Sequence, residues 1–261
     1  MELPIYVVDA FTKHAFAGNP AGVCILDSPV SDEWMQNVAA EMKHAETAFL
    51  QARDSGFQLR WFTPTIEVDL CGHATLASAH ILWESGRLHQ NQTATFETRS
   101  GILTANRVGE LIQLDFPSDP PVEKPVPWNL ETILGAKPIW YGESSMDMLV
   151  ELADEHTVRS LTPDLNGIRQ LGNRGLMVTA SGSTHDFISR FFAPQFGIDE
   201  DSVTGSAHCC LGPYWSAKLG KQTLEGYQAS HRGGLVRVSM HRDRALLSGH
   251  AVTILEGVIR C

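Results

Sequence analysis

The first half of the chain alternates short apolar runs with two segments of helical character. Ser31 precedes a stretch to Lys43 in which Trp34, Met35, Val38 and Met42 recur at helical spacing, and this predicts a helix capped by Ser31. A second helix, rich in small residues, is expected from Gly72 to about Glu84. The expected strands of this half are 5–8, 23–26, 47–52, 57–62, 93–98, 102–107 and 111–116.

A proline-rich segment follows these strands. Five prolines fall within the eleven residues 117–127, which excludes a central strand or a helix interior there. We therefore predict a domain boundary, with an N-terminal domain at 1–117 and a C-terminal domain at 118–254.

The second domain again alternates strands and helices. Its expected strands are 139–141, 148–152, 176–180 and 187–192, its expected helices a short one within 162–171 and a longer one from Gly205 to about Leu219, and short β segments fill most of 223–259.

One element is repeated in the residues themselves. Arg60-Trp-Phe-Thr-Pro64 matches Arg190-Phe-Phe-Ala-Pro194, and each is followed by an acidic, irregular stretch. Each stretch then leads into a glycine-initiated helix of small residues, at Gly72 and at Gly205. Two short strands that end in proline could coincide by chance, but the shared order and composition favour an internal duplication.

The duplication predicts a binding site for an anion. The first N–H groups of a helix have no partner within it, and together with the helix dipole they attract negative charge. Two related halves would bring the helix starts at Gly72 and Gly205 to one cleft, where a carboxylate could bind without Arg or Lys.

Composition and charge limit the classes of binding partner and the cellular compartment that we expect. The 261 residues are 43% hydrophobic and carry a net charge of −10, which disfavours nucleic acid as a partner. We expect no membrane association, because no apolar run is long enough to span a bilayer, and the N-terminus does not resemble a secretory signal. An odd number of cysteines without a CxxC pair is typical of free thiols in the cytoplasm. These cysteines are Cys24, Cys71, Cys209, Cys210 and Cys261.

Several catalytic motifs are absent from the sequence. It contains no GxGxxG, no P-loop, no HExxH and no GxSxG. His44 and Glu46 fit half of a zinc-deaminase signature, but the cysteine pair that such enzymes need is missing. His208 beside Cys209 and Cys210 lacks further ligands at suitable spacing, so no metal is expected there. A hydrolase triad could be drawn from the polar residues near the helix starts, but nothing in their spacing demands it.

Polar residues near the two helix starts are the chemical candidates. Glu46 could serve as a base that becomes an acid, although a capping or exposed position would explain it equally well. His73, in the first turn of its helix, should stay neutral and suits hydrogen bonding to substrate, although a lone histidine is more often structural. Asp201 could complement the charge of the second helix, and Ser206 could merely cap it.

Motifs along nearly the whole chain resemble the PhzF family of phenazine-biosynthesis-type proteins. They occur in the order that this family shows. The matching segments are Val8–Thr12, Phe16–Val23, Glu46–Phe49, Arg60–Pro64, Glu67–Thr75, Arg190–Pro194 and Asp199–Ala207.

This resemblance implies an α+β, diaminopimelate epimerase-like fold. Two similar domains would each wrap a curved sheet around a central helix, and the C-terminal strand, 255–261, would return to the first domain. The implied activity is isomerisation of dihydro-3-hydroxyanthranilate or a related carboxylate, without metal or organic cofactor, by a homodimer. Glu46 would carry the proton, assisted by His73, Asp201 and Ser206. Substrate binding would fall to Gly72, Ala74, Gly205 and Asn19.

Two other functions remain open at this stage. Related racemases and epimerases use two cysteines, one from each half. Here Cys71 lies close to where the first would sit, but the segment from Asp201 to Gly205 has none, so Cys71 is interpreted as a small packed residue. The third possibility is a non-catalytic protein that binds a small molecule on the same fold.

Overall fold

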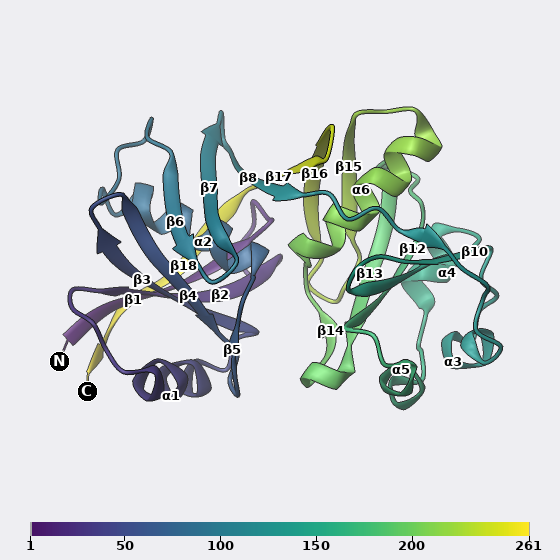
Figure 1. Cartoon of the computed structure of the whole chain (residues 1–261), viewed down its shortest axis with the longest axis horizontal. Coiled ribbons are helices and arrows are strands. Elements are labelled where there is room, and N and C mark those ends of the chain that lie inside the picture. Colours follow the sequence, from purple (N-terminus) through teal and green to yellow (C-terminus); the bar gives the residue numbers. More distant parts are fainter. Residues whose placement is uncertain (1, 261) are drawn as a thin grey trace. The chain divides into compact units, whose positions relative to one another are not determined.

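The computed structural model describes residues 2–260 and separates into two compact units (Figure 1). Unit 1 runs to Asp115 and resumes at Ser248, whereas unit 2 spans Phe116–Leu247. The sequence predicts the boundary at 117 and the returning strand at 255–261. The return begins earlier because a long C-terminal strand pairs with the N-terminal one over its whole length, from Ala251 onward. Cys261, which ends the predicted return, lies outside the described residues.

Unit 1 contains a mixed sheet of parallel and antiparallel strand pairs. β1 lies between β18 and β2 and is antiparallel to both. β2 pairs with β3 in parallel, β3 and β4 are antiparallel, and β4 pairs with β6 in parallel. The antiparallel strands β6, β7 and β8 complete it. The bounds are β1 Glu2–Ala10, β2 Asn19–Leu26, β3 Glu46–Arg53, β4 Gly56–Phe62, β5 Glu67–Val68, β6 Ala94–Thr98, β7 Gly101–Val108, β8 Leu111–Pro117 and β18 Ala251–Arg260.

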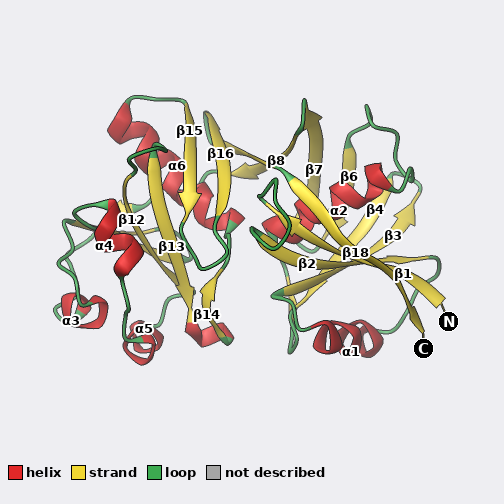
Figure 2. Ribbon diagram, turned by 180° about the vertical axis from the view of Figure 1, so that it is seen from behind, coloured by secondary structure: helices red, strands yellow, loops and turns green. Residues whose placement is uncertain are grey.

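Two helices cover the faces of this sheet (Figure 2). Helix α1, Asp32–Met42, is amphipathic and begins where the Ser31 hydroxyl accepts the Trp34 N–H at 3.2 Å. Helix α2, Gly72–Glu84, packs against β1, β2, β3, β7 and β18 and is buried along nearly its whole length. A helix that is buried on all sides needs a sheet that curves around it. The burial of α2 therefore agrees with the predicted fold, in which a curved sheet wraps around a central helix.

Unit 2 repeats the pairing pattern of unit 1 strand for strand. β10 and β11 are antiparallel, β11 and β12 parallel, β12 and β13 antiparallel, β13 and β15 parallel, and β15 and β16 antiparallel. The short strand β14 pairs with β13 as β5 pairs with β4. The bounds are β9 Val122–Glu123, β10 Trp140–Glu143, β11 Asp147–Glu151, β12 Gly175–Ser181, β13 Phe187–Ala193, β14 Ile198–Asp201, β15 Thr223–Gln228, β16 Gly234–His241 and β17 Arg244–Gly249.

The repeated arginine makes the same contacts in both units. Arg60 donates two N–H groups to the Glu67 carboxylate, at 2.7 and 2.6 Å, and lies over the phenylalanine ring two residues further along. Arg190 donates to Glu200 at 2.7 and 2.9 Å and lies over the equivalent ring. In each unit this pair of hydrogen bonds holds the short strand that precedes the central helix. The matched sequence segments therefore have the same structural role.

The central helix of unit 2, α6, spans Gly205–Leu219 and contains a proline. Pro213 has no N–H to give to the carbonyl of Cys209 one turn earlier, and the Asp119 N–H takes its place at 2.9 Å. Three shorter α-helices, α3 Leu130–Leu134, α4 Glu155–Ser160 and α5 Leu165–Leu171, and a 3₁₀ turn at Pro194–Phe196 lie elsewhere in unit 2. The sequence predicted only α5, within 162–171.

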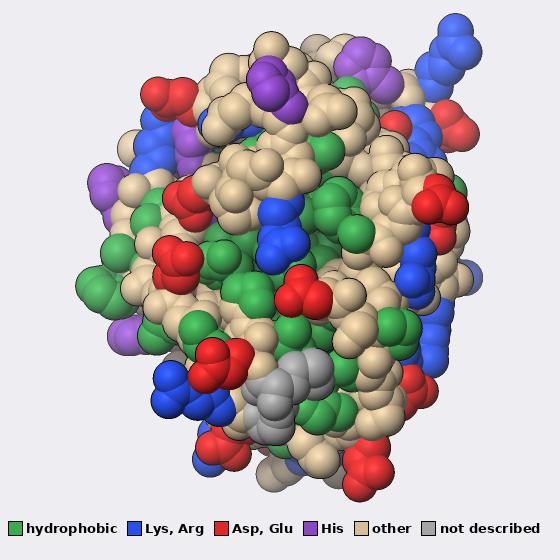
Figure 3. Space-filling view, turned by 90° about the vertical axis from the view of Figure 1, so that its left-hand side faces the viewer, with side chains coloured by type: hydrophobic (Ala, Val, Ile, Leu, Met, Phe, Trp, Pro, Cys, Tyr) green, Lys and Arg blue, Asp and Glu red, His purple; other side chains and the backbone are tan. Residues whose placement is uncertain are grey.

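None of the helices in the described part of the chain is both long and apolar enough to cross a bilayer. On the face shown in Figure 3, acidic and basic side chains are interspersed, so the net negative charge does not gather in one patch there.

Candidate active site

Three chain segments begin next to one another in unit 1. Asn19 is the first residue of β2 and Glu46 the first residue of β3. Parallel pairing sets Ala21, two residues along β2, beside Glu46, so the two strands start at the same end of the sheet. Helix α2 packs on both strands and begins at Gly72. Strand register therefore gathers polar residues that are distant in the sequence.

His73 is the centre of this group. Its Nε2 atom lies 3.3 Å from the Glu46 carboxylate, and its Nδ1 atom lies 3.2 Å from the Asn19 side-chain nitrogen and 3.5 Å from Cys71 Sγ. The Glu46 side chain is 14% exposed and that of His73 only 5%. The two predicted catalytic residues of this half thus share one site, and the predicted substrate-binding residues Gly72 and Asn19 adjoin it.

The contacts of His73 favour one tautomer. Both neighbours of Nδ1, the Asn19 amide nitrogen and the Cys71 thiol, can donate a hydrogen bond. If Nδ1 accepts, the ring proton of neutral His73 is on Nε2, the atom in contact with Glu46. This arrangement sets a donor beside the Glu46 carboxylate. Cys71, interpreted from the sequence as a packed residue, is buried but also touches the imidazole.

The loop that leads to Asn19 is held from both ends. Asp9, fully buried at the end of β1, accepts the Phe16 N–H at 2.7 Å. Phe11 has a left-handed backbone, with φ of 63°, and donates its N–H to the carbonyl of His250 at 2.7 Å. Such conformations cost energy and persist only where the surroundings enforce them. The loop therefore delivers Asn19 to His73 in a fixed position.

In unit 2, the start of α6 holds a second polar group. The Arg174 guanidinium donates to Ser206 Oγ at 2.9 Å and forks onto Asp147, whose side chain is 3% exposed. Burial opposes the positive charge of Arg174, but Asp147 outweighs it and raises the pKa of the guanidinium. Arg174 belongs to no motif. It lies beside Asp147 because parallel pairing of β11 and β12 aligns Asp147 with Gly175.

Asp201 belongs to a tight network immediately before α6. Its carboxylate accepts the Thr204 hydroxyl at 2.5 Å, and its carbonyl accepts from the buried Gln228 side chain at 2.8 Å. The oxygen of that side chain accepts the Thr204 N–H at 2.8 Å. Thr204 is the N-cap residue of α6 but makes no side-chain capping bond, since its hydroxyl is engaged by Asp201. Predicted residues Asp201, Gly205 and Ser206 thus adjoin one helix start.

The histidine and cysteines inside α6 are packing residues. His208 is fully buried, its Nδ1 lies 2.8 Å from the Thr204 carbonyl, and burial lowers its pKa to about 4. Burial raises the pKa of the Cys209 thiol to about 12, and raises that of Cys210 as well. Neither thiol would ionise readily at neutral pH, so neither suits a role as a base.

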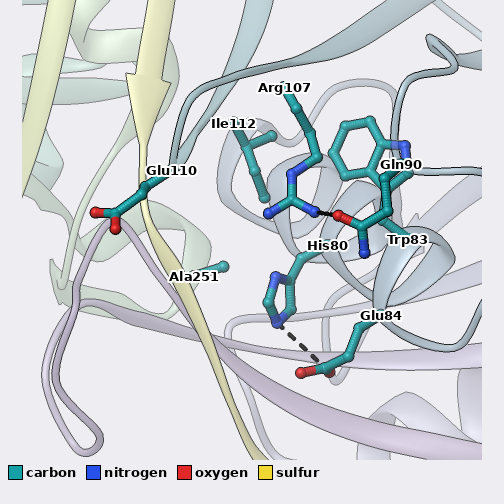
Figure 4. Close-up of a pocket in the computed structure, with 8 residues that line it drawn as sticks. All are labelled: His80, Trp83, Glu84, Gln90, Arg107, Glu110, Ile112 and Ala251. Atoms are coloured by element: carbon teal, nitrogen blue, oxygen red, sulfur yellow. Dashed lines mark hydrogen bonds and ion pairs between the residues drawn. The ribbon is translucent and has the colours of Figure 1, made fainter.

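A cavity of about 220 Å³ lies along the C-terminal half of α2 (Figure 4), and neither Glu46 nor His73 lines it. Its polar groups already engage one another. Arg107 donates to Gln90 and lies over the Trp83 ring, and His80 Nε2 contacts the Thr253 hydroxyl at 3.1 Å. Burial lowers the pKa of His80 despite a nearby carboxylate. The chemistry of the polar clusters, rather than this hollow, identifies the candidate site.

Comparisons with known proteins agree with this fold. The model of the family PhzC-PhzF, phenazine biosynthesis-like protein, matches residues 8–257. An uncharacterised isomerase of Halalkalibacterium halodurans is 52% identical over 98% of each chain. A PhzF-family crystal structure from Enterococcus faecalis is 40% identical, covers 100% of both chains and superposes with a TM-score of 0.97.

A more distant structure shares the fold alone. A hydroxyproline epimerase from Agrobacterium vitis, solved with bound trans-4-hydroxy-L-proline, has a TM-score of 0.67 at 9% identity, and the match covers 99% of this chain and 92% of that one. The fold is therefore the epimerase-like one that the sequence predicts. The chain belongs to the PhzC-PhzF family of phenazine biosynthesis-like proteins, a family of isomerase-like enzymes.

Proposed function

We propose that this protein is a cofactor-independent isomerase that moves a proton between carbon atoms of a small carboxylate-bearing substrate. The contact that carries the proposal is the 3.3 Å approach of His73 Nε2 to the Glu46 carboxylate. Glu46 is largely shielded from water, and a shielded carboxylate beside a fixed donor suits a group that must first accept and then return a proton.

In the proposed reaction, Glu46 takes a proton from one carbon of the substrate. The electron pair of the broken C–H bond enters the conjugated system of the substrate, and hydrogen-bond donors stabilise the resulting anion. Glu46 then gives the proton to a second carbon, so no proton is gained or lost overall. His73, protonated on Nε2, orients the carboxylate of Glu46. It also stabilises the negative charge of this carboxylate before Glu46 takes the substrate proton and after Glu46 returns it.

The start of α2 is the proposed anchor for the substrate carboxylate. Cys71, its N-cap residue, makes no side-chain capping bond, so the amides near Gly72 and Ala74 are not occupied by it. The resemblance assigns Asp201 and Ser206 of unit 2 to the same reaction. Because Arg174 can only donate, Ser206 Oγ accepts from it and directs its own proton elsewhere, which suits a donor to an anionic substrate.

Epimerisation by two thiols is the alternative, and the fold shared with hydroxyproline epimerase is its support. Cys71 could supply one thiol. The thiols of unit 2 argue against it, because Cys209 and Cys210 are buried and their pKa values are raised by burial. We therefore favour the single-carboxylate mechanism.

Isotope exchange tests the proposal. The chain is incubated in heavy water with a panel of dihydro-3-hydroxyanthranilate, related carboxylates and single enantiomers of amino acids, and deuterium incorporation is followed by NMR. The Glu46→Gln variant should lose exchange by about 10²- to 10⁴-fold on whichever compound wild type accepts. Glu41→Gln, which changes an exposed glutamate on α1, is the matched control and should exchange normally.

Equal exchange by wild type and Glu46→Gln on a true substrate would remove Glu46 from this role. Inversion of an amino acid that depends on Cys71 would favour the epimerase instead. From the resemblance alone we also propose a cytoplasmic homodimer, and sedimentation of the purified chain tests its oligomeric part.

A further inference from the structure

Three side chains of unit 1 have potential metal-ligand atoms that lie close together. One ligand atom each from Glu46, Cys71 and His73 lies within 4.8 Å of the other two. We propose that these residues form a site for Zn²⁺ or a similar borderline-soft divalent cation. Neither the family nor the proposed reaction calls for such an ion, so the site would regulate or poison the enzyme rather than assist it.

The ligand types suit zinc. Cysteine thiolate, histidine nitrogen and glutamate oxygen are its usual protein ligands, at about 2.0–2.3 Å, so ligand atoms around a tetrahedral ion lie roughly 3.5 Å apart. The contacts of His73 with Cys71 Sγ, 3.5 Å, and with Glu46, 3.3 Å, are already of this size. Because an ion takes only one ring nitrogen, the ligand that now lies beside the other nitrogen must approach it from a distance of up to 4.8 Å.

The surroundings would hold such an ion firmly. Cys71 and His73 are only 6% and 4% exposed, and both lie at the start of a long, buried helix. Glu46 comes from the first position of a strand that pairs on both sides. Asn19 contacts the histidine ring at Nδ1. An ion on Nε2 would move the ring proton to Nδ1, and the Asn19 amide would turn so that its oxygen accepts this proton, as outer partners of metal-bound histidines commonly do. Three protein ligands leave a fourth position for water.

Metal binding would block the proposed reaction. The ion would displace the proton of the Cys71 thiol to solvent and engage the carboxylate oxygen that Glu46 needs for proton transfer. This consequence rests on the proposed function, whereas the binding itself does not. A chelator should reverse the inhibition, since no covalent bond to the protein is broken.

Direct metal titration tests the site. Chelator-treated wild-type chain is titrated with Zn²⁺ by calorimetry, and with Co²⁺ while the near-ultraviolet thiolate-to-cobalt band is recorded. We expect one ion per chain and a thiolate band that disappears in Cys71→Ala but persists in Cys24→Ala, a buried thiol elsewhere in unit 1. Asn19→Ala should bind about 10- to 100-fold more weakly. Circular dichroism of each variant confirms folding.

Absence of stoichiometric binding, or a thiolate band that survives in Cys71→Ala, overturns the site. Saturating Zn²⁺ that leaves isotope exchange unchanged overturns its inhibitory role. The proposed function fails separately, if wild type exchanges no proton on any carboxylate while the titrations still show the Cys71-dependent site.

Discussion

The side-chain nitrogen of Asn19 lies 3.2 Å from Nδ1 of His73, although 54 residues separate them. An amide nitrogen only donates, so this contact favours Nδ1 as an acceptor and the ring proton on Nε2, the nitrogen that lies 3.3 Å from the Glu46 carboxylate. The pairing thus favours one histidine tautomer at the candidate active site.

Asn19→Leu should weaken this selection. We expect the ring of wild-type His73 to be protonated on Nε2, and the variant to show a mixture of tautomers together with slower isotope exchange. Long-range ¹H–¹⁵N NMR of the imidazole, assigned with His73→Gln, measures it. An unchanged tautomer in Asn19→Leu would show that Cys71 or the helix start governs the ring instead.

Arg174→Met should destabilise unit 2. The substitution removes the guanidinium that donates two hydrogen bonds to the buried Asp147 carboxylate. Breaking such a partly buried ion pair costs roughly 2–3 kcal/mol. Urea denaturation measures the loss. The double variant Arg174→Met with Asp147→Asn should recover part of it, because the unpaired charge is gone. A double variant less stable than either single one would contradict the charge-pair explanation.

The two repeated arginines allow a matched comparison. Arg60→Met and Arg190→Met each remove a two-pronged bond to a glutamate, and we expect losses of about 2–3 kcal/mol. Arg190→Met should cost more, since Arg190 also donates to the Leu161 carbonyl at 2.6 Å. Denaturant unfolding ranks the two variants. The reverse order would mean that the second contact of Arg60, with Asp32, matters more than its exposure suggests.

His208 should make the fold sensitive to mild acid. Burial lowers its pKa from 6.5 to about 4, so the unfolded chain binds more protons between these values and unfolding becomes easier as the pH falls. This contribution of neutral His208 to the free energy of unfolding is fully present above pH 6.5, and about 3 kcal/mol of it is lost by pH 4.

The variant His208→Gln, which can still donate to the Thr204 carbonyl, tests this dependence. Its free energy of unfolding should fall less steeply between pH 7 and pH 5 than that of wild type, as measured by urea denaturation at each pH. Parallel curves for the two proteins would show that carboxylates elsewhere account for the acid sensitivity.

Local signals in the sequence were enough for the longer helices. Ser31 caps α1 as predicted, and α2 and α6 begin at the glycines that the repeat identified. A cap and a periodic apolar face act within a few residues, so they can be recognised from the chain alone. The short helix α4 was missed, although Asp154 caps it by accepting the Thr157 N–H at 2.7 Å, because six residues are too few to show a period.

The sequence by itself determined the family, the duplicated fold and the residue types near the two helix starts. Tertiary structure decided the contacts among them. Cys71 meets His73 within one helix start, whereas parallel strand pairing brings the start of β2, with Asn19, beside the start of β3, with Glu46, and sets Arg174 next to Asp147. A register shift of one residue between β2 and β3 would misplace Asn19 relative to Glu46, and a sequence alone does not specify register between distant strands.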